Sequence, residues 1–304
     1  MKIRFPGCKV SYVFLSSIFL FLLTSSCEQG DVRRDENDSI MGEALSSDKV
    51  KIDYRVNGDK KDTTLIFIHQ WLCNQTYWQN QISYFSGNYR VVTLDLAGHG
   101  RSGNDRNDYS MDLFADDVIA VMKDIKARKV YLIGHSFGAS VAVKVALKVP
   151  DRVLGILAVD AFQNLTQDYP ENEIENKFKP YRSDFQTTVK KHASLLFGDH
   201  PDTLLVQRVI NDWASADPDM AIAVMTEYLR FKPSEWTKNL TVPVFALNAS
   251  KFPANALGNQ KMLKSYKMYS LPRVGHFPQL ENPGYFNEVV KTILREQSQK
   301  PSPR

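Results

Sequence analysis

The stretch Lys129–Lys148, KVYLIGHSFGASVAVKVALK, carries the pattern that decides the fold. Its first half is a continuous apolar, β-branched run, typical of a strand buried on both faces, and its second half has helical spacing. Between them stands Gly134-His135-Ser136-Phe137-Gly138, a G-x-S-x-G pattern. A serine in such a strand-to-helix turn is strained and exposes its hydroxyl, while the two glycines let neighbouring chain pass closely. The pattern therefore predicts that Ser136 is a nucleophile.

Similar apolar runs occur on both sides of this stretch and end at His69, Asp95, Asp160 and Asn248. Helical patterns separate them, so the chain is predicted to form a parallel sheet with right-handed crossovers. Val50–Val56 alternates apolar and polar residues, which favours a half-exposed strand at a sheet edge. Ligands bind at the carboxyl ends of the strands in such folds, and polar residues at these ends are therefore candidates for a site.

Three further segments carry a family resemblance. DLAGHGRS, residues 95–102, is similar to a D-x-x-G-x-G-x-S loop, and VGHFP, residues 274–278, to a loop with a catalytic histidine. IHQW, residues 68–71, matches an H-G-x turn, with Gln70 in place of the glycine. Over residues 50 to 296 the chain thus resembles the α/β-hydrolases that have a helical lid.

This resemblance implies an α/β-hydrolase fold, with a mostly parallel twisted sheet flanked by helices. The core is expected in residues 50–160 and 242–296, and the lid in 161–241, after the strand that ends at Asp160. The resemblance also implies that the backbone N–H groups of Trp71 and Phe137 form the oxyanion hole. Gln70 is a further candidate, since its side chain would lie close to the reacting atoms.

Chain order separates the six histidines. His276 alone follows Ser136 at the end of the last predicted strand, where it can serve as general base and then as general acid. The family braces loops with histidines placed like His69, His99 and His135. His192 and His200 fall in a polar helical region and are expected to be solvated.

The acid of the triad is found by elimination. Most of the family has it after the strand that VPVFALN, residues 242–248, represents, but residues 236–280 contain no Asp or Glu. Asp160 ends the preceding strand, and some branches of the family have their acid there. Neighbouring strand ends are adjacent in space, so we favour Asp160 over a bare Ser-His pair. Asn248 and Ser250 are alternative residues that could orient His276 through an uncharged hydrogen bond. Asp168 and Glu171 are weaker candidates for the triad acid.

The predicted lid is rich in apolar residues at helical spacing. A lid excludes water and shapes the substrate pocket. Its candidate lining residues are Phe185, Leu195, Phe197, Trp213, Met220 and Met225. This composition favours a compact, neutral, largely apolar ester, lactone or amide as the substrate.

The amino terminus resembles a bacterial lipoprotein signal. Basic residues precede an apolar run from Val10 to Leu23, and small residues lead to Cys27. We expect a signal peptide at 1–26, a lipidated Cys27 as membrane anchor, a flexible tether at 27–49 and a disordered tail at 297–304. A secreted, unlipidated protein is the alternative. With a lipidated Cys27, the protein would reside in the cell envelope as a membrane-anchored lipoprotein.

Composition limits the partners. With 304 residues, of which 43% are apolar, the chain can bury a large core. Removing residues 1–26 deletes three basic residues and no acidic one, so the net charge falls from +4 to +1 and no nucleic-acid-binding face is implied. Cys73 is left unpaired, so the fold does not depend on disulfides.

The favoured function is a serine hydrolase of esterase or lactonase type that acts on a small molecule and requires no metal or cofactor. A first alternative is a cofactor-free dioxygenase of N-heteroaromatic compounds, because Gln70-Trp71-Leu72-Cys73 resembles a loop of those enzymes. A second is a non-catalytic ligand-binding protein on a hydrolase scaffold.

Overall fold

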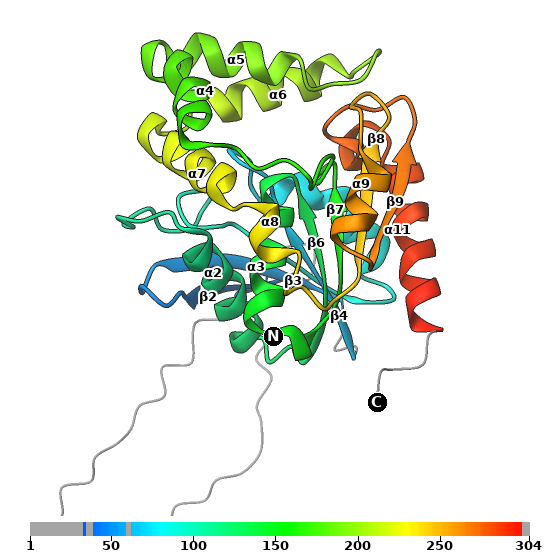
Figure 1. The fold of residues 1–304 in the computed structure, drawn as a ribbon. Helices are drawn as coiled ribbons and strands as arrows, with labels where there is room; N and C mark the ends of the chain where they lie inside the picture. The colour runs from blue at the N-terminus through cyan, green and yellow to red at the C-terminus, as the bar shows by residue number, and fades with distance from the viewer. Residues whose placement is uncertain (1–32, 35–38, 59–61, 300–304) are drawn as a thin grey trace, which may run out of the picture. The chain divides into compact units, whose positions relative to one another are not determined.

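The computed structural model describes residues 33–34, 39–58 and 62–299 (Figure 1). The predicted signal peptide, the predicted lipidation site Cys27 and the first part of the predicted tether lie outside the described residues. Within the described part of the chain, no helix has both the length and the apolar character that crossing a membrane would require.

One sheet forms the centre of the described unit, and its order is β1-β2-β3-β5-β4-β6-β7-β8-β9. Strand β1 pairs with β2, β2 with β3, and β3 with β5, all antiparallel. All the other neighbouring pairs of the sheet are parallel. The strands are β1 (Arg33–Arg34), β2 (Ile40–Leu45), β3 (Lys51–Asn57), β4 (Thr63–Ile68), β5 (Arg90–Leu94), β6 (Lys129–His135), β7 (Val153–Val159), β8 (Val244–Ala249) and β9 (Tyr266–Leu271). The predicted mostly parallel sheet is confirmed.

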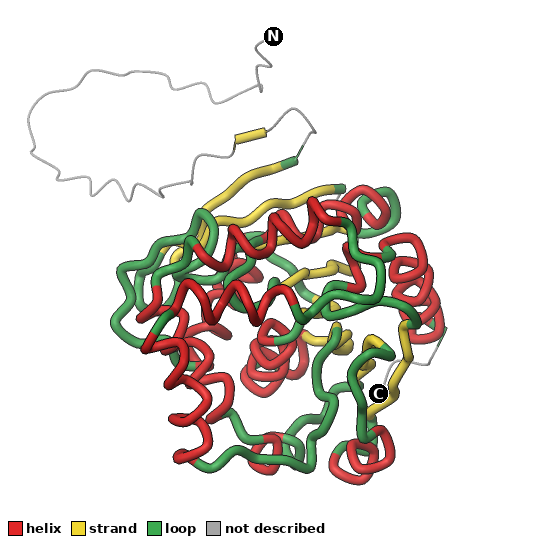
Figure 2. Tube along the Cα trace, turned by 90° about the horizontal axis from the view of Figure 1, so that it is seen from above, coloured by secondary structure: helices red, strands yellow, loops and turns green. Residues whose placement is uncertain are grey.

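Helices cover both faces of this sheet, because alternate residues of each strand point to opposite sides. Ile66 and Ile68 belong to one hydrophobic cluster, and Leu65 and Phe67 to the other. The first cluster is covered by α2 (Met111–Asp124) and α3 (Phe137–Lys148), and the second by α1 (Gln79–Phe85) and α11 (Pro283–Ser298). Seen from above, helices flank the strands (Figure 2).

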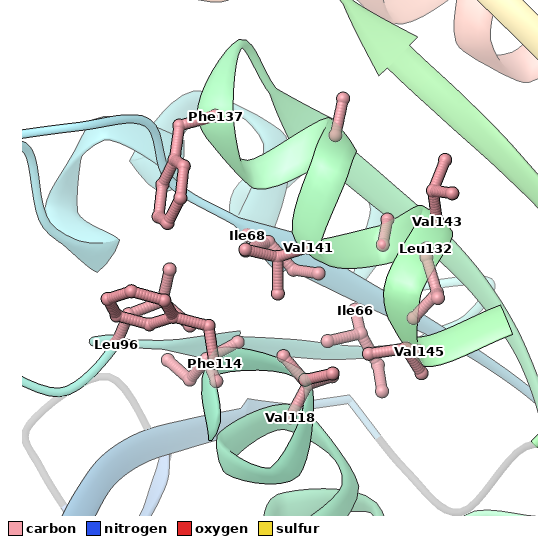
Figure 3. Packing of buried hydrophobic residues seen from close by; sticks show 14 of the residues in the cluster. Ile66, Ile68, Leu96, Phe114, Val118, Leu132, Phe137, Val141, Val143 and Val145 are labelled. Carbon is pink, nitrogen blue, oxygen red and sulfur yellow. The ribbon is translucent and has the colours of Figure 1, made fainter. Parts of the chain in front are cut away.

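Figure 3 shows the first cluster from close by. Phe114 of α2 and Val141 of α3 belong to this cluster together with Ile66 and Ile68 of β4. Each of these side chains is fully buried, and such burial stabilises the fold by about 1.5–3 kcal/mol per side chain. This packing fixes α3, and therefore its first turn, against the carboxyl end of β4.

The amino-terminal part of the body differs from the prediction. β3 is covered by β2 on one side and β5 on the other, so the expectation of an edge strand at Val50–Val56 was wrong. Because β2 begins at Ile40, the tether predicted to reach residue 49 was also too long. The stretch is tied to the body by Ser46, whose hydroxyl donates to Asp117 at 2.6 Å, and by Arg106, which pairs with both Asp48 and Asp117. At the other end, α11 extends to Ser298, past the predicted start of the tail at 297.

The lid is helical, as predicted, and follows β7. The full set of lid helices is α4 (Glu171–Ser183), α5 (Phe185–Ser194), α6 (Thr203–Ala214), α7 (Pro218–Arg230) and α8 (Pro233–Trp236). The short helices α9 (Ala256–Met262) and α10 (Pro278–Glu281) follow β8 and β9. Figure 1 shows α4 to α7 gathered beyond one end of the sheet.

Candidate active site

The turn between β6 and α3 holds Ser136 in a strained conformation, with φ 51° and ψ −115°. A Cβ on Gly134 would lie 2.3 Å from the carbonyl oxygen of Gly138. A Cβ on Gly138 would lie 2.5 Å from the carbonyl oxygens of both Ile68 and His69. Both glycines are thus required by close backbone approach, and the end of β4 is held against the first turn of α3. Ser136 itself remains partly exposed.

The turn after β4 and the start of α3 carry the two backbone N–H groups that were expected to form the oxyanion hole. Phe137 is the first residue of α3, where a backbone N–H has no partner within the helix. In the described part of the chain, neither its N–H nor that of Trp71 donates to another group. The indole N–H of Trp71 donates to the carbonyl oxygen of Ala221 in α7 at 2.8 Å, which anchors the turn to the lid. Two amides from adjacent segments therefore remain available to a bound oxyanion.

Asp160 and His276 are brought together at the same edge of the sheet. Asp160 follows β7, is 1% exposed, and its Oδ2 accepts a hydrogen bond from His276 Nδ1 at 2.6 Å. Its Oδ1 accepts the backbone N–H of Ala249 at 2.9 Å. Because His135 pairs with Val159, Ser136 and Asp160 leave neighbouring strands at the same level. A buried carboxylate thus fixes the ring of His276 close to the serine turn.

The loop that carries His276 is itself held in place. Both carboxylate oxygens of Glu281 accept the backbone N–H of Gly275 at 3.0 Å, and Oε1 accepts that of Phe277 at 3.1 Å. The backbone N–H of His276 donates to Leu196 in the lid at 2.6 Å. The backbone carbonyl oxygen of His276 accepts a hydrogen bond from His135 Nε2 at 2.6 Å. The imidazole is therefore positioned through its backbone as well as through Asp160.

The other candidate orienters of His276 lie elsewhere. Asn248 uses its Oδ1 to accept the backbone N–H of Ala161 at 3.2 Å, and Ser250 donates its own N–H to Leu271. The loop after β8 instead places Phe252 against His276, with ring centres 6.3 Å apart. Asp168 bonds to Ser234 and Glu171 pairs with Arg230, both within the lid insertion. Among the described carboxylates, Asp160 is the one that contacts His276.

The side chain of Gln70 lies against Nε2 of His276, the ring nitrogen that does not face Asp160. Its buried side chain places Oε1 3.1 Å from Nε2 of the imidazole. Its Nε2 lies 3.5 Å from Cys73 Sγ, which also receives the indole N–H of Trp213 at 3.5 Å. Burial raises the pKa of Cys73 to about 12, so this group is a neutral thiol at ordinary pH. The amide therefore contacts the expected general base directly, a partner that its position in the sequence did not specify.

Of the remaining histidines, His200 is exposed and the others are at least partly buried. His69 and His99 each bond a backbone carbonyl, and burial lowers the pKa of His69 to about 4 and that of His99 to about 3. The expectation that His192 is solvated was wrong. Its Nδ1 lies 2.6 Å from Tyr181 Oη, and burial lowers the pKa of His192 to about 4. Its spacing from Phe185 and Val189, on the buried face of α5, was the signal that could have revealed this.

The lid places some of its predicted lining residues at the site and others away from it. Trp213 packs edge-on against Trp71 at 5.1 Å between ring centres, and Phe197 stacks on Phe277 at 5.2 Å. Leu195 is 61% exposed, so its prediction as a lining residue was wrong. Met225 is partly buried and packs against both the main core cluster and a small cluster inside the lid. The predicted lining residues Phe185 and Met220 are both buried. A cavity of about 630 Å³ lies between the lid and the body, and Cys73 and Met220 are among the residues that line it.

Known proteins share this fold. Residues 63–283 match a protein family described as the alpha/beta hydrolase fold. The "Bifunctional esterase/perhydrolase DCH" of Acinetobacter calcoaceticus is 27% identical over 256 residues, which cover 78% of this chain and 93% of that protein. The "3-oxoadipate enol-lactonase 2" of Acinetobacter baylyi is 20% identical over 262 residues, 83% and 96% of the two chains. A solved thermophilic esterase from Thermogutta terrifontis superposes with a TM-score of 0.73 at 18% identity, covering 84% of this chain and 98% of that one.

Proposed function

The chain belongs to the α/β-hydrolase fold family, and from this premise we propose that it is a serine hydrolase of the esterase or lactonase type. The observation that carries the proposal is the buried Asp160 carboxylate on His276 Nδ1, beside a serine in a strained strand-to-helix turn. One relative named as an esterase/perhydrolase and another named as an enol-lactonase support the same reaction class. The proposed bond is that of a small, neutral, largely apolar ester, lactone or related acyl compound.

The proposed reaction proceeds through an acyl-Ser136 intermediate. Ser136 Oγ attacks the carbonyl carbon while its proton passes to His276 Nε2, and Asp160 stabilises the resulting imidazolium. The backbone N–H groups of Trp71 and Phe137 hold the oxyanion, and the amino end of α3 favours the same negative charge. The proton then goes to the leaving alcohol oxygen. Water completes the cycle by attacking the acyl carbon, with His276 again as base.

A fluorophosphonate probe tests this proposal on the folded protein. The probe forms a bond from phosphorus to an activated serine oxygen with loss of fluoride, and we expect it to modify Ser136. The measurement is peptide mass spectrometry after labelling, with heat-unfolded protein as the control for non-specific reaction. An intact, folded protein in which Ser136 stays unlabelled would show that the serine is not activated, and the hydrolase proposal would fail.

A second candidate function is a cofactor-free dioxygenase of N-heteroaromatic compounds. The observation that favours it is His276 Nε2, which faces Gln70 and makes no hydrogen bond with Ser136 in the described chain. A His-Asp pair in that arrangement could take a proton directly from a bound substrate. Such an activity would persist without the serine hydroxyl. A non-catalytic ligand-binding role would leave neither labelling nor turnover.

We also propose that Cys27 is lipidated and that the protein is anchored in the cell envelope. The apolar run and the small residues before Cys27 support this, although they lie outside the described residues. Replacing Cys27 with alanine is expected to move the protein from the membrane fraction to the soluble envelope fraction, as followed by immunoblotting of fractionated cells. Replacement of Cys73, which is buried in the body, serves as the control. An unchanged distribution of Cys27→Ala would contradict lipidation.

A further inference from the structure

The general base of the proposed reaction has a hydrogen-bond partner other than the nucleophile. His276 Nδ1 is engaged by Asp160 at 2.6 Å, and Nε2 lies 3.1 Å from the Gln70 side chain. In the described part of the chain, no hydrogen bond joins Ser136 Oγ to His276, whose two ring nitrogens have Asp160 and Gln70 as their partners. Nε2 is the atom that must accept the serine proton, and it offers a single hydrogen-bonding position. Gln70 and Ser136 therefore compete for the same atom.

The Gln70 amide can satisfy this nitrogen in either protonation state. With Nδ1–H donating to Asp160, a neutral imidazole has its lone pair on Nε2. Turning the Gln70 amide by 180° exchanges its oxygen and NH2 group, so that the NH2 group can donate to this lone pair. A protonated imidazole instead donates from Nε2–H to the amide oxygen. The other branch of the amide faces the Cys73 thiol, 3.5 Å away, which can serve as weak donor or acceptor. The contact is thus chemically stable before and after protonation.

The contact is also connected to the lid. Cys73 receives the indole N–H of Trp213 in α6, so a chain of contacts runs from the lid through Cys73 and Gln70 to His276. The same turn is attached to α6 by Tyr77, whose hydroxyl donates to Asp212 at 2.7 Å. A movement of α6 or of this turn would therefore reach the amide of Gln70.

We propose that Gln70 caps the general base of the resting enzyme, and that acyl transfer begins only when this side chain has left His276 Nε2. The inference rests on the proposed serine hydrolase function and adds a control step to it. After release, Ser136 Oγ–H bonds to Nε2, the proton passes to that nitrogen, and Oγ bonds to the carbonyl carbon of the substrate. Gln70 is therefore a positioning residue that acts through His276.

Removal of the cap is expected to accelerate attack by the serine. We expect Gln70→Ala to react with a fluorophosphonate probe about 3- to 10-fold faster than the wild-type protein, the factor that loss of one competing hydrogen bond allows. The measurement is the second-order rate constant of labelling at Ser136, on protein whose thermal melting confirms folding. Gln70→Gly, which has the residue that the family uses, provides a second variant should the alanine protein be unstable.

Gln75→Ala is the matched control, because it removes another buried amide from the same loop but one that bonds Asp53 and Asp95. It should leave the labelling rate within twofold of wild type. Equal acceleration in this control would mean that general loosening of the loop is responsible, and the proposal would be overturned. Unchanged or slower labelling of Gln70→Ala would overturn it as well. If wild-type Ser136 is never labelled, the hydrolase proposal fails instead.

The pH dependence of Ser136 labelling distinguishes a direct contact between the side chain at position 70 and His276 from a purely structural role of that side chain. In Gln70→Glu, a carboxylate would face Nε2 and stabilise the protonated imidazole. We expect the acidic limb of the labelling rate to move to higher pH by about 1–2 units. An unshifted limb in a folded variant would show that the side chain at position 70 does not contact the base in solution.

Discussion

Replacing Ser136 with alanine is expected to lower ester turnover by about five to six orders of magnitude, because the change removes the atom that forms the acyl bond. Folding should be retained. Alanine lacks only the hydroxyl, and the backbone N–H at this position still donates to Val159 at 2.9 Å. The measurement is the initial rate on the best substrate from an ester and lactone screen. Thermal melting of the same preparation reports the folded fraction.

Ser140→Ala is the matched control for this change. Ser140 is a buried serine in α3, four residues after Ser136, and no proposed step uses its hydroxyl. We expect its turnover to remain within a few fold of wild type. If Ser136→Ala retained high activity on the same substrate, acyl-enzyme chemistry would be excluded. The dioxygenase or another direct-base mechanism would then be favoured.

Asp160→Asn is expected to lower turnover by about 10⁴-fold with little change in the fold. The carboxylate has two assigned partners, since Oδ1 accepts from Ala249 N–H and Oδ2 faces His276 Nδ1. An asparagine that keeps the bond from Ala249 must turn its NH2 group toward Nδ1. That nitrogen then has to be the acceptor, so the imidazole proton moves to Nε2. In this tautomer His276 cannot take the proton of Ser136.

Asp168→Asn provides the comparison for Asp160→Asn. Asp168 accepts a hydrogen bond from Ser234 in α8 and makes no hydrogen bond with His276, so its loss should change turnover by no more than a few fold. Retention of full turnover by Asp160→Asn would show that Ser136 and His276 operate without this acid. An equal loss in both variants would indicate damage to the lid instead of an altered tautomer.

Much of the fold could be predicted because its signals are local. The buried parallel strands are continuous apolar runs, and the turn at Ser136 has glycines at two positions where a Cβ would come within 2.5 Å of neighbouring backbone atoms. β2 escaped prediction because IMGEAL contains a glycine and a glutamate and adjoins polar sequence. Its pairing with β3 and the Ser46–Asp117 bond, between positions 71 apart, stabilise it. The burial of His192 had a local signal in its helical spacing, but its partner Tyr181 belongs to a different helix.

The sequence by itself determined the strand-turn-helix at Ser136, the order of serine, acid and histidine along the chain, and the absence of a carboxylate between residues 236 and 280. Only the tertiary structure decided which side chains meet His276. Asp160 lies 116 positions from it and Gln70 lies 206 positions from it. Their contacts depend on strand register, such as Val159 opposite both His135 and Leu247, and on how the loop after β9 folds back over the sheet. Local sequence preferences do not specify such long-range packing, because it results from the burial of many side chains at once.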